Sequence, residues 1–421
     1  MESYRLHSWF YDSLLLISLF LWAGVIITKP LELYYSYVPV VILLPFLILK
    51  YGLPKPLILI FLVLLISGLY KVSNSLNTYG QLFKVFFGAF FSYLFYYLIL
   101  RAYKINVSYL FKLYLKAAWI ITIIGIVQFF SYLIGFTLGY DYSWVFSKWS
   151  VIPGGNFNIR INAIFSEPTY YATFISPAIF VAVNNIIRKG FYYSKAQSAI
   201  MIVTYFLTFS GNAYNGFFII ILVMLFNLGV LRYSLLFIPL LLAGYFYSYQ
   251  NIAEFRDRLD GTLNIFETGQ FEIGKTHGSA INLYDNYNIA TQNFVNNPFF
   301  GTGLGSHPVA FEKYTITKHV NIYGFALNTQ DANSMFLRLI SETGLFGTSI
   351  FIFFLFYCFV KKRNEIDDEV WLISGSLFVL IILNLFRQGH FFYSGFPFYF
   401  WLYYFNWKNN NQGKLANGLN P

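Results

Sequence analysis

The sequence has 421 residues and a formal net charge of +10, and 57% of its residues are hydrophobic, 22% aromatic and only 11% charged. A soluble domain carries roughly 25% charged residues, so this composition excludes an ordinary soluble protein and indicates a polytopic membrane protein. The single cysteine, Cys358, excludes an internal disulfide and a cysteine-based zinc site. No run of lysine and arginine lies among aromatic residues in a polar segment, so we expect no nucleic-acid partner despite the positive charge.

Long apolar runs predict twelve membrane-spanning helices, because one span needs roughly 20 mostly apolar residues. The first run, 14–27, lacks a strongly basic stretch before it and a small-residue cleavage site, so we expect a retained span and not a signal peptide. The fold class is therefore an all-α polytopic membrane protein with a large polar region before the tenth span. In chain order, the expected spans cover residues 11–28, 35–50, 55–70, 84–101, 111–135, 164–187, 195–209, 212–229, 232–248, 332–360, 370–386 and 390–406.

The distribution of lysine and arginine predicts the orientation of the spans, because short cytoplasmic segments carry an excess of these residues. With the N-terminus in the cytoplasm, sixteen lysines and arginines fall on cytoplasmic segments and six on the short outer segments. Both termini are therefore expected in the cytoplasm. The predicted regions are 1–163, with spans one to five and the first outer loop; 164–249, with spans six to nine; the outer polar region 250–331; 332–407, with the last three spans; and a polar, disordered tail, 408–421.

Glycines and histidines in the polar region do not predict a cofactor. Gly301, Gly303 and Gly305 lie close together, yet no Gly-Lys-Ser/Thr follows and no strand precedes them. We therefore expect a turn that closes the region onto the membrane and not a nucleotide site. The three histidines of the region lack the spacing of metal ligands, so we expect no metal and no cofactor. These histidines are His277, His307 and His319.

Two acidic residues lie at expected helix N-termini on the outer face, where the partial positive charge of a helix attracts phosphate. Glu167 stands between Ser166 and Pro168 at the start of the sixth span, and Asp331 stands at the start of the tenth. Both are candidates for the proton acceptor of a reaction on this face. The alternative is that the two acids only cap their helices.

Polar residues also enter the tenth span. Asp331, Ser334, Arg338, Ser341 and Glu342 recur at steps of three or four, which places them on one helical stripe. A charge inside a span costs roughly 2.5 kcal/mol or more, so it should face protein or a water-filled cavity. We expect Arg338 to bind an anion with Glu342 as its partner, and the alternative is a purely structural ion pair.

Six further residues form the expected substrate-binding set. Arg160 precedes the sixth span and Arg387 follows the eleventh, so both are expected near the outer face, where each can bind an anionic group or serve as an ordinary interfacial arginine. The full set is Arg160, Arg256, Arg258, His307, Asn333 and Arg387.

The order of these motifs resembles the O-antigen polymerase (Wzy) family, to which the O-antigen ligase family is related. The motifs cover less than a quarter of the chain, whereas the expected topology is similar throughout. The similar residues are Arg160 with Phe165-Ser166-Glu167-Pro168-Thr169-Tyr170, then Asn297-Pro298-Phe299-Phe300-Gly301-Thr302-Gly303-Leu304-Gly305, and then Asn333-Ser334-Met335-Phe336-Leu337 leading to Ser341-Glu342-Thr343-Gly344-Leu345-Phe346-Gly347.

The chain departs from its apparent relatives at two places. Ligases carry a histidine directly before the asparagine of the last motif, and this chain has Ala332 there, with Asp331 one residue earlier. This difference favours polymerase over ligase. An arginine that is often present between the seventh and eighth spans is also missing, because Ser210-Gly211-Asn212 occupies that turn.

The resemblance implies a metal-independent glycosyltransferase of the bacterial inner membrane that acts at the periplasmic face. Such an enzyme moves a growing glycan from undecaprenyl pyrophosphate onto the non-reducing end of a lipid-linked repeat unit. The implied partners are the lipid-linked oligosaccharide, membrane lipid, a chain-length regulator and a flippase. Three alternatives stay open: an O-antigen ligase, a transporter or flippase of lipid-linked sugars, and a structural or chain-length-controlling protein.

Overall fold

The computed structural model describes residues 2–27, 32–154, 159–188, 192–229, 237–251, 253–271, 276, 278–318, 329–362 and 366–416. The described part of the chain is mostly helical. In these ranges the only sheet pairs two short antiparallel strands, β1 (Val25–Ile27) and β2 (Leu33–Tyr34). The chain is thus an all-α protein with one small hairpin-like addition.

Six helices in the described ranges are long and apolar enough to cross a membrane, as the sequence predicts for a membrane protein. Three shorter apolar helices accompany them, at Trp9–Phe20, Tyr37–Tyr51 and Gly211–Asn227. The total of twelve spans stays a prediction. The six helices are α3 (Lys55–Ser73), α4 (Tyr79–Ala102), α5 (Val107–Leu133), α7 (Pro168–Ile187), α14 (Met335–Tyr357) and α15 (Asp368–Arg387).

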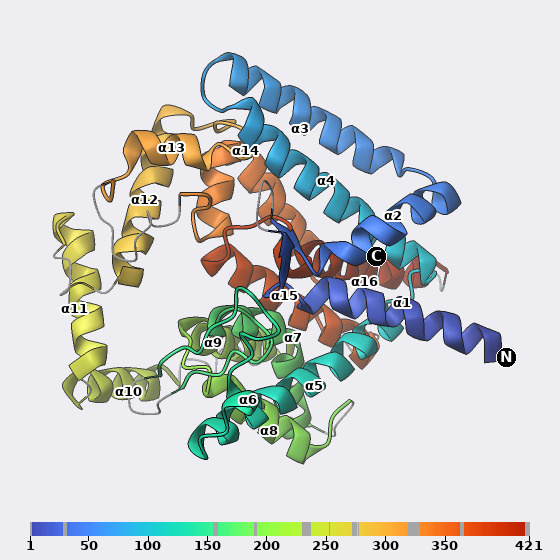
Figure 1. Ribbon diagram of the computed structural model, residues 1–421, viewed down its shortest axis with the longest axis horizontal. Coiled ribbons are helices and arrows are strands. Elements are labelled where there is room, and N and C mark those ends of the chain that lie inside the picture. Colours follow the sequence, from blue (N-terminus) through green and yellow to red (C-terminus); the bar gives the residue numbers. More distant parts are fainter. Residues whose placement is uncertain are drawn as a thin grey trace.

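The centre of the molecule is built around α7, which packs against α8 (Lys195–Phe206), α9 (Gly211–Asn227) and α15. Figure 1 shows α7, α9 and α15 between the N-terminal helices and the yellow and orange segments. Every residue of α7 from Tyr171 to Asn185 is buried. Further elements outside residues 252–331 are α1 (Glu2–Phe20), α2 (Tyr37–Tyr51), α6 (Thr137–Tyr140), α10 (Phe237–Asn251), η3 (Tyr393–Gly395) and α16 (Phe396–Ala416).

The expected boundaries are wrong at both ends of the chain. The first span was expected at 11–28, but α1 ends at Phe20 and residues 25–27 form β1. The β-branched residues Val25, Ile26 and Ile27 favour a strand, and the ring of Tyr35 packs against Gly24. At the other end, the tail from residue 408 was expected to be disordered, but α16 continues to Ala416.

The polar region 250–331, expected as a long loop, contains three helices in its described part: α11 (Ala253–Thr268), α12 (Gly278–Asn296) and α13 (His307–Tyr314). Helix α12 packs on both α13 and α14, whereas α11 packs on α10 and α12. Figure 1 shows α10, α11, α12 and α13 following one edge of the molecule. The region is therefore a folded layer that is attached to α14.

The glycine-rich turn joins this layer to α14 through backbone hydrogen bonds. The amides of Thr302 and Gly303 donate to the carbonyls of Ser341 and Glu342, at 3.2 and 2.8 Å. In return, Leu345 and Phe346 donate to the carbonyls of residues 298 and 299, at 2.8 and 3.0 Å. This exchange is possible because α14 is interrupted at Gly344, whose φ of 64° and ψ of −164° are not helical.

Replacing Gly305 by alanine should destabilise the protein. Gly305 has a φ of +78°, and an added Cβ would lie 2.5 Å from the carbonyl oxygen of Gln81. The left-handed conformation alone costs about 1–2 kcal/mol for an L-residue, and the clash adds to it. Thermal unfolding of the detergent-purified variant should show a lower melting temperature.

The matched control is Gly80→Ala on the neighbouring helix α4, because nothing lies within 4 Å of the added Cβ at that position. Its melting temperature should equal or slightly exceed that of the wild type, since alanine is the better helix former. An unchanged melting temperature for Gly305→Ala would show that the turn is not fixed to α4.

Candidate functional site

The candidate site lies where the N-terminus of α7, the C-terminus of α15 and the segment before α14 meet. Helices α7 and α15 pack along each other, so Glu167 before α7 and Arg387 at the end of α15 come to one end of the pair. The segment 387–390 then passes beside Asp331 and Asn333. Residues that are far apart in the sequence therefore share one place in the fold.

Glu167 does not act as a side-chain cap. It occupies the N-cap position in an extended conformation, with Pro168 as the first helical residue, and its carboxylate makes no capping hydrogen bond. Burial raises the pKa of this carboxyl above its usual value, and nearby Arg387 and Arg160 offset part of the effect. The side chain is nevertheless exposed to solvent. The carboxylate thus has protein groups close to it and still reaches solvent, and we call the place that it shares with Arg160 and Arg387 the recess.

Two arginines act on Glu167 from different elements. Arg387 is half-buried, and its guanidinium has no hydrogen-bond partner among the residues that the structure describes. Arg160 is held in place, because its amide donates to the carbonyl of Ile152 at 2.9 Å and its Nε donates to the carbonyl of Thr208 at 3.1 Å. The recess thus has one fixed arginine and one whose donors have no protein acceptor in the described ranges.

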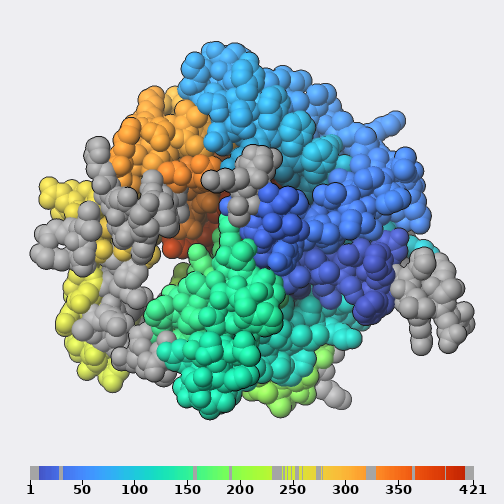
Figure 2. All heavy atoms as spheres, viewed as in Figure 1, coloured from blue at the N-terminus to red at the C-terminus, as the bar shows by residue number. Residues whose placement is uncertain are grey.

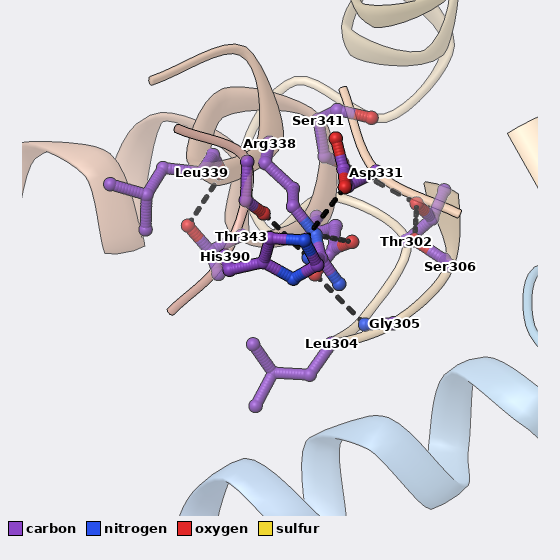
Figure 3. A network of polar contacts seen from close by, with 12 residues as sticks. Thr302, Leu304, Gly305, Ser306, Asp331, Arg338, Leu339, Ser341, Thr343 and His390 are labelled. Carbon is purple, nitrogen blue, oxygen red and sulfur yellow. Dashed lines mark hydrogen bonds and ion pairs between the residues drawn. The ribbon is translucent and has the colours of Figure 1, made fainter. Parts of the chain in front are cut away.

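Asp331 contacts a histidine that the sequence analysis did not select. His390 Nε2 lies 2.9 Å from Asp331 Oδ2, and Asp331 Oδ1 accepts the amide of Asn333 at 2.8 Å. Figure 3 shows the imidazole of His390 directed at this carboxylate. Although burial opposes the effect, His390 and Arg338 hold the pKa of Asp331 well below its usual range.

Gly389 makes this contact possible, because a Cβ there would lie 2.6 Å from Asp331 Oδ1. A signal for His390 was present in the sequence, since Gln388-Gly389-His390 interrupts the apolar pattern directly after Arg387. Reading that interruption as part of the outer face would have added His390 to the candidate residues. The structure therefore pairs Asp331 with a histidine although residue 332 is alanine.

Arg338 and Glu342 form a buried ion pair beneath the recess. Arg338 Nε lies 2.8 Å from Glu342 Oε1, and the two side chains are 3% and 0% exposed. Arg338 Nη1 also donates to the carbonyl of Gly389 at 2.6 Å, while Glu342 Oε2 accepts the amide of Gly305 at 2.8 Å. In Figure 3 the side chain of Arg338 lies beside His390 and extends toward the turn at Gly305. The pair connects three segments.

The remaining candidates lie apart from this arrangement. Asn333 belongs to it through its amide, but His307 is buried at the start of α13 beside the ring of Phe311. Arg256 is exposed on α11, with Nε 4.0 Å from the carboxylate of Asp257. The side chain of Arg258 and the histidines 277 and 319 lie outside the described residues.

An apolar cavity of about 400 Å³ adjoins the recess, between α11, α12, α14 and α15. Its lining includes Phe386, directly before Arg387, and Ser334, directly after Asn333. Figure 2 shows the molecule hollowed between the yellow segment of α11 and the green segments. The complete lining is Phe266, Leu283, Tyr287, Ser334, Phe336, Leu337, Ile382, Leu385 and Phe386.

Fold and site together define an α-helical protein with membrane-spanning helices, in which acidic and basic residues converge beside an apolar cavity. Compared with protein-family models and with curated proteins, the chain has no match. Within the described ranges, no three histidine, cysteine, aspartate or glutamate side chains are grouped so that they could hold a metal ion.

Glu342→Gln should strongly destabilise the protein, because it leaves Arg338 buried without its negative partner. Breaking a buried pair from one side costs about 3–5 kcal/mol. Thermal unfolding in detergent should show a large fall in melting temperature. The control is Glu312→Gln, which removes an ion pair to Lys318 whose side chains are more than half exposed and should change little. Equal melting temperatures for the two variants would contradict a supporting role for the Arg338–Glu342 pair.

Proposed function

We propose that this chain is a polysaccharide polymerase of the O-antigen type, a metal-independent glycosyltransferase. It moves a growing glycan from undecaprenyl pyrophosphate onto the non-reducing end of a lipid-linked repeat unit, at the periplasmic face of the bacterial inner membrane. One observation carries the proposal. A carboxylate in a recess, Glu167, lies with Arg387 and Arg160 beside an apolar cavity. This combination suits a substrate that is anionic in the middle and apolar at one end.

The arginines suit the leaving group of this reaction. A pyrophosphate departs from the anomeric carbon with the electron pair of the broken bond, so it needs charge stabilisation and no general acid. Arg387, whose donors have no protein acceptor in the described part of the chain, is available for bidentate contact with a phosphate. Arg160, held by Ile152 and Thr208, supplies a second fixed charge.

Glu167 is the better candidate for the general base. The attacking hydroxyl forms the new bond to the anomeric carbon and gives its proton to a carboxylate. Two carboxylates near the recess, Glu167 and Asp331, were expected to compete for this role. Asp331 is held by His390 and the amide of Asn333, and its lowered pKa makes it a weak base. Glu167 has a raised pKa and reaches solvent, so it can accept the proton.

Arg338 and the Asp331–His390 pair then have supporting roles. The expected anion-binding role of Arg338 stays a prediction. In the described structure its guanidinium is buried, in contact with Glu342, the carbonyl of Gly389 and the ring of Phe391. In that position Arg338 holds the 389–390 segment beside Asp331. A positioning role for Arg338 follows from these contacts.

The apolar cavity supports a lipid-linked substrate. Its lining is almost entirely apolar. It includes Phe386 and Ser334, the sequence neighbours of Arg387 and Asn333. A polyprenyl chain that enters this cavity would place its pyrophosphate at the recess. A chain-length regulator and a flippase are the proposed protein partners, because a polymerase must receive its repeat units on the outer face and must stop at a given length.

O-antigen ligase is a second candidate, and one observation favours it. Ligases carry a histidine in the last motif where this chain has Ala332, yet the fold brings His390 to the neighbouring Asp331. A histidine is therefore present in space although it is absent from the motif. The phenotype of a deletion strain distinguishes the two reactions.

Deletion of the gene should leave lipopolysaccharide with the core and a single repeat unit. A deletion strain with core alone would contradict the polymerase and favour loss of ligation or of flipping. Arg387→Ala should reproduce the single-repeat band, because the pyrophosphate loses its bidentate partner, and Arg387→Lys should restore only short ladders. The control is Arg188→Ala at the opposite end of α7, which should restore the full ladder at equal protein level.

Glu167→Gln should lower the polymerisation rate by about 100-fold or more, the usual contribution of a general base. A base must be deprotonated, so the wild-type rate should fall as the pH drops through the pKa of Glu167. Because that pKa is raised, the fall should begin nearer to neutral pH than for an ordinary glutamate, whose pKa is 4.5. Purified protein with a synthetic lipid-linked repeat unit gives the profile. A rate that persists to strongly acidic pH, with Glu167→Gln active and Asp331→Asn inactive, would assign the base to Asp331.

A further inference from the structure

We propose that the rings of Tyr34, Tyr37, Tyr170 and Tyr393 form a binding subsite for the sugar residues of the substrate, and this inference rests on the proposed function. The rings of Tyr34, Tyr37 and Tyr393 each contact the ring of Trp22, and the ring of Tyr170 joins the group through Tyr393. The distances between ring centroids are 4.7 Å for Trp22–Tyr393, 5.2 Å for Trp22–Tyr37, 5.6 Å for Trp22–Tyr34, 5.8 Å for Tyr34–Tyr37, 5.9 Å for Tyr34–Tyr393 and 5.2 Å for Tyr170–Tyr393. We call these four tyrosines with Trp22 the aromatic wall.

The aromatic wall begins at the carboxylates of the recess. The ring of Tyr393 lies 5.0 Å from that of His390, whose Nε2 lies 2.9 Å from Asp331 Oδ2. Tyr170 stands three residues after Glu167, at the start of α7. A sugar bound on these rings is therefore beside the group that accepts the proton of the attacking hydroxyl.

The outer end of the aromatic wall has a charged rim. The hydroxyl of Tyr34 donates to Glu32 Oε2 at 2.5 Å, and Lys148 Nζ lies 2.5 Å from the same oxygen. Lys148 also lies 5.1 Å from the centre of the Tyr34 ring. Glu32 and Lys148 are exposed, so hydrogen-bonding groups continue from the rings to the surface. The wall thus extends from the recess to solvent.

The four tyrosines differ from the structural tyrosines of this protein. Tyr34, Tyr37, Tyr170 and Tyr393 are each partly exposed. Within the described residues, the hydroxyls of Tyr37 and Tyr170 have no hydrogen-bond partner. Among the buried tyrosines, Tyr96, Tyr114, Tyr193 and Tyr403 donate to backbone carbonyls at 2.7–3.0 Å, whereas the hydroxyls of Tyr205 and Tyr399 have no partner in the described structure. Partial exposure to solvent is therefore what separates the four tyrosines from the structural ones.

Sugar chemistry fits such a surface. A pyranose presents apolar C–H faces and polar hydroxyl edges, and tyrosine offers an apolar ring with a polar tip. Ser334 and Phe386 line the apolar cavity, whereas the aromatic wall meets the site where the ring of Tyr393 lies beside that of His390. An amphiphilic substrate with its pyrophosphate at Arg387 would have a separate surface for each of its two ends.

The test is binding of a soluble oligosaccharide, which needs no turnover. The probe is the repeat unit that mild acid releases from the polyprenyl pyrophosphate pool of the strain carrying the protein, and titration calorimetry measures its affinity. Tyr37→Leu and Tyr393→Leu should each weaken binding about tenfold, which corresponds to a lost stacking contact of about 1.4 kcal/mol. Tyr37→Phe, which keeps the ring, should lose only a few-fold.

The matched control is Tyr404→Leu, which removes a tyrosine from another aromatic cluster, with Phe354 and Trp407, and should bind like the wild type. Melting temperatures identify any variant that fails to fold, and Tyr37→Phe retains the packing if the leucine variants do not. Wild-type affinity in Tyr37→Leu and Tyr393→Leu, or no binding by the wild type, would overturn the subsite. Binding that depends on these tyrosines in a protein without polymerase activity would support the subsite and contradict the proposed function instead.

Discussion

The buried ion pair between Arg338 and Glu342 is the interaction on which the rest of the site depends. Each side chain makes one further hydrogen bond, Arg338 to the carbonyl of Gly389 and Glu342 to the amide of Gly305. The pair thereby joins α14 to the segment after α15 and to the glycine-rich turn. In an apolar surrounding neither charge can be left without its partner, so the three segments must keep their relative positions.

Because the Arg338–Glu342 pair fixes the segments beneath the site, the exposed side chains above it can have different roles. The carboxylate of Asp331 contacts His390 and accepts the amide of Asn333. Glu167 and Arg387 lie at adjacent ends of the central helices α7 and α15, which pack against each other. A site built on packed helices holds its side chains more accurately than a site on loops. Glu167 in the recess and Arg387 beside it are therefore placed by the best-packed part of the molecule. The apolar cavity and the aromatic wall lie next to the recess, since Phe386 precedes Arg387 and the ring of Tyr393 lies beside that of His390.

Patterns within one helix were predictable from the sequence, and contacts between distant segments were not. The spacing of four residues indicated the Arg338–Glu342 pair, and Ser166-Glu167-Pro168 indicated the start of α7 to within a few residues. The contact of His390 with Asp331 depends on how α15 ends relative to α14, and no local pattern contains that information. The end of α1 was mispredicted because an apolar run alone does not separate a helix from a strand.

The interruption of α14 at Gly344 has a consequence for the order of assembly. Leu345 and Phe346 donate their amides to the carbonyls of residues 298 and 299, so the turn supplies acceptors that an unbroken helix would provide itself. Within a bilayer, an unsatisfied backbone amide costs several kcal/mol. The turn precedes α14 in the chain and leaves the ribosome first, yet its acceptors are needed only after α14 has inserted. Insertion of α14 and docking of the polar layer are therefore one coupled step in the biogenesis of this protein.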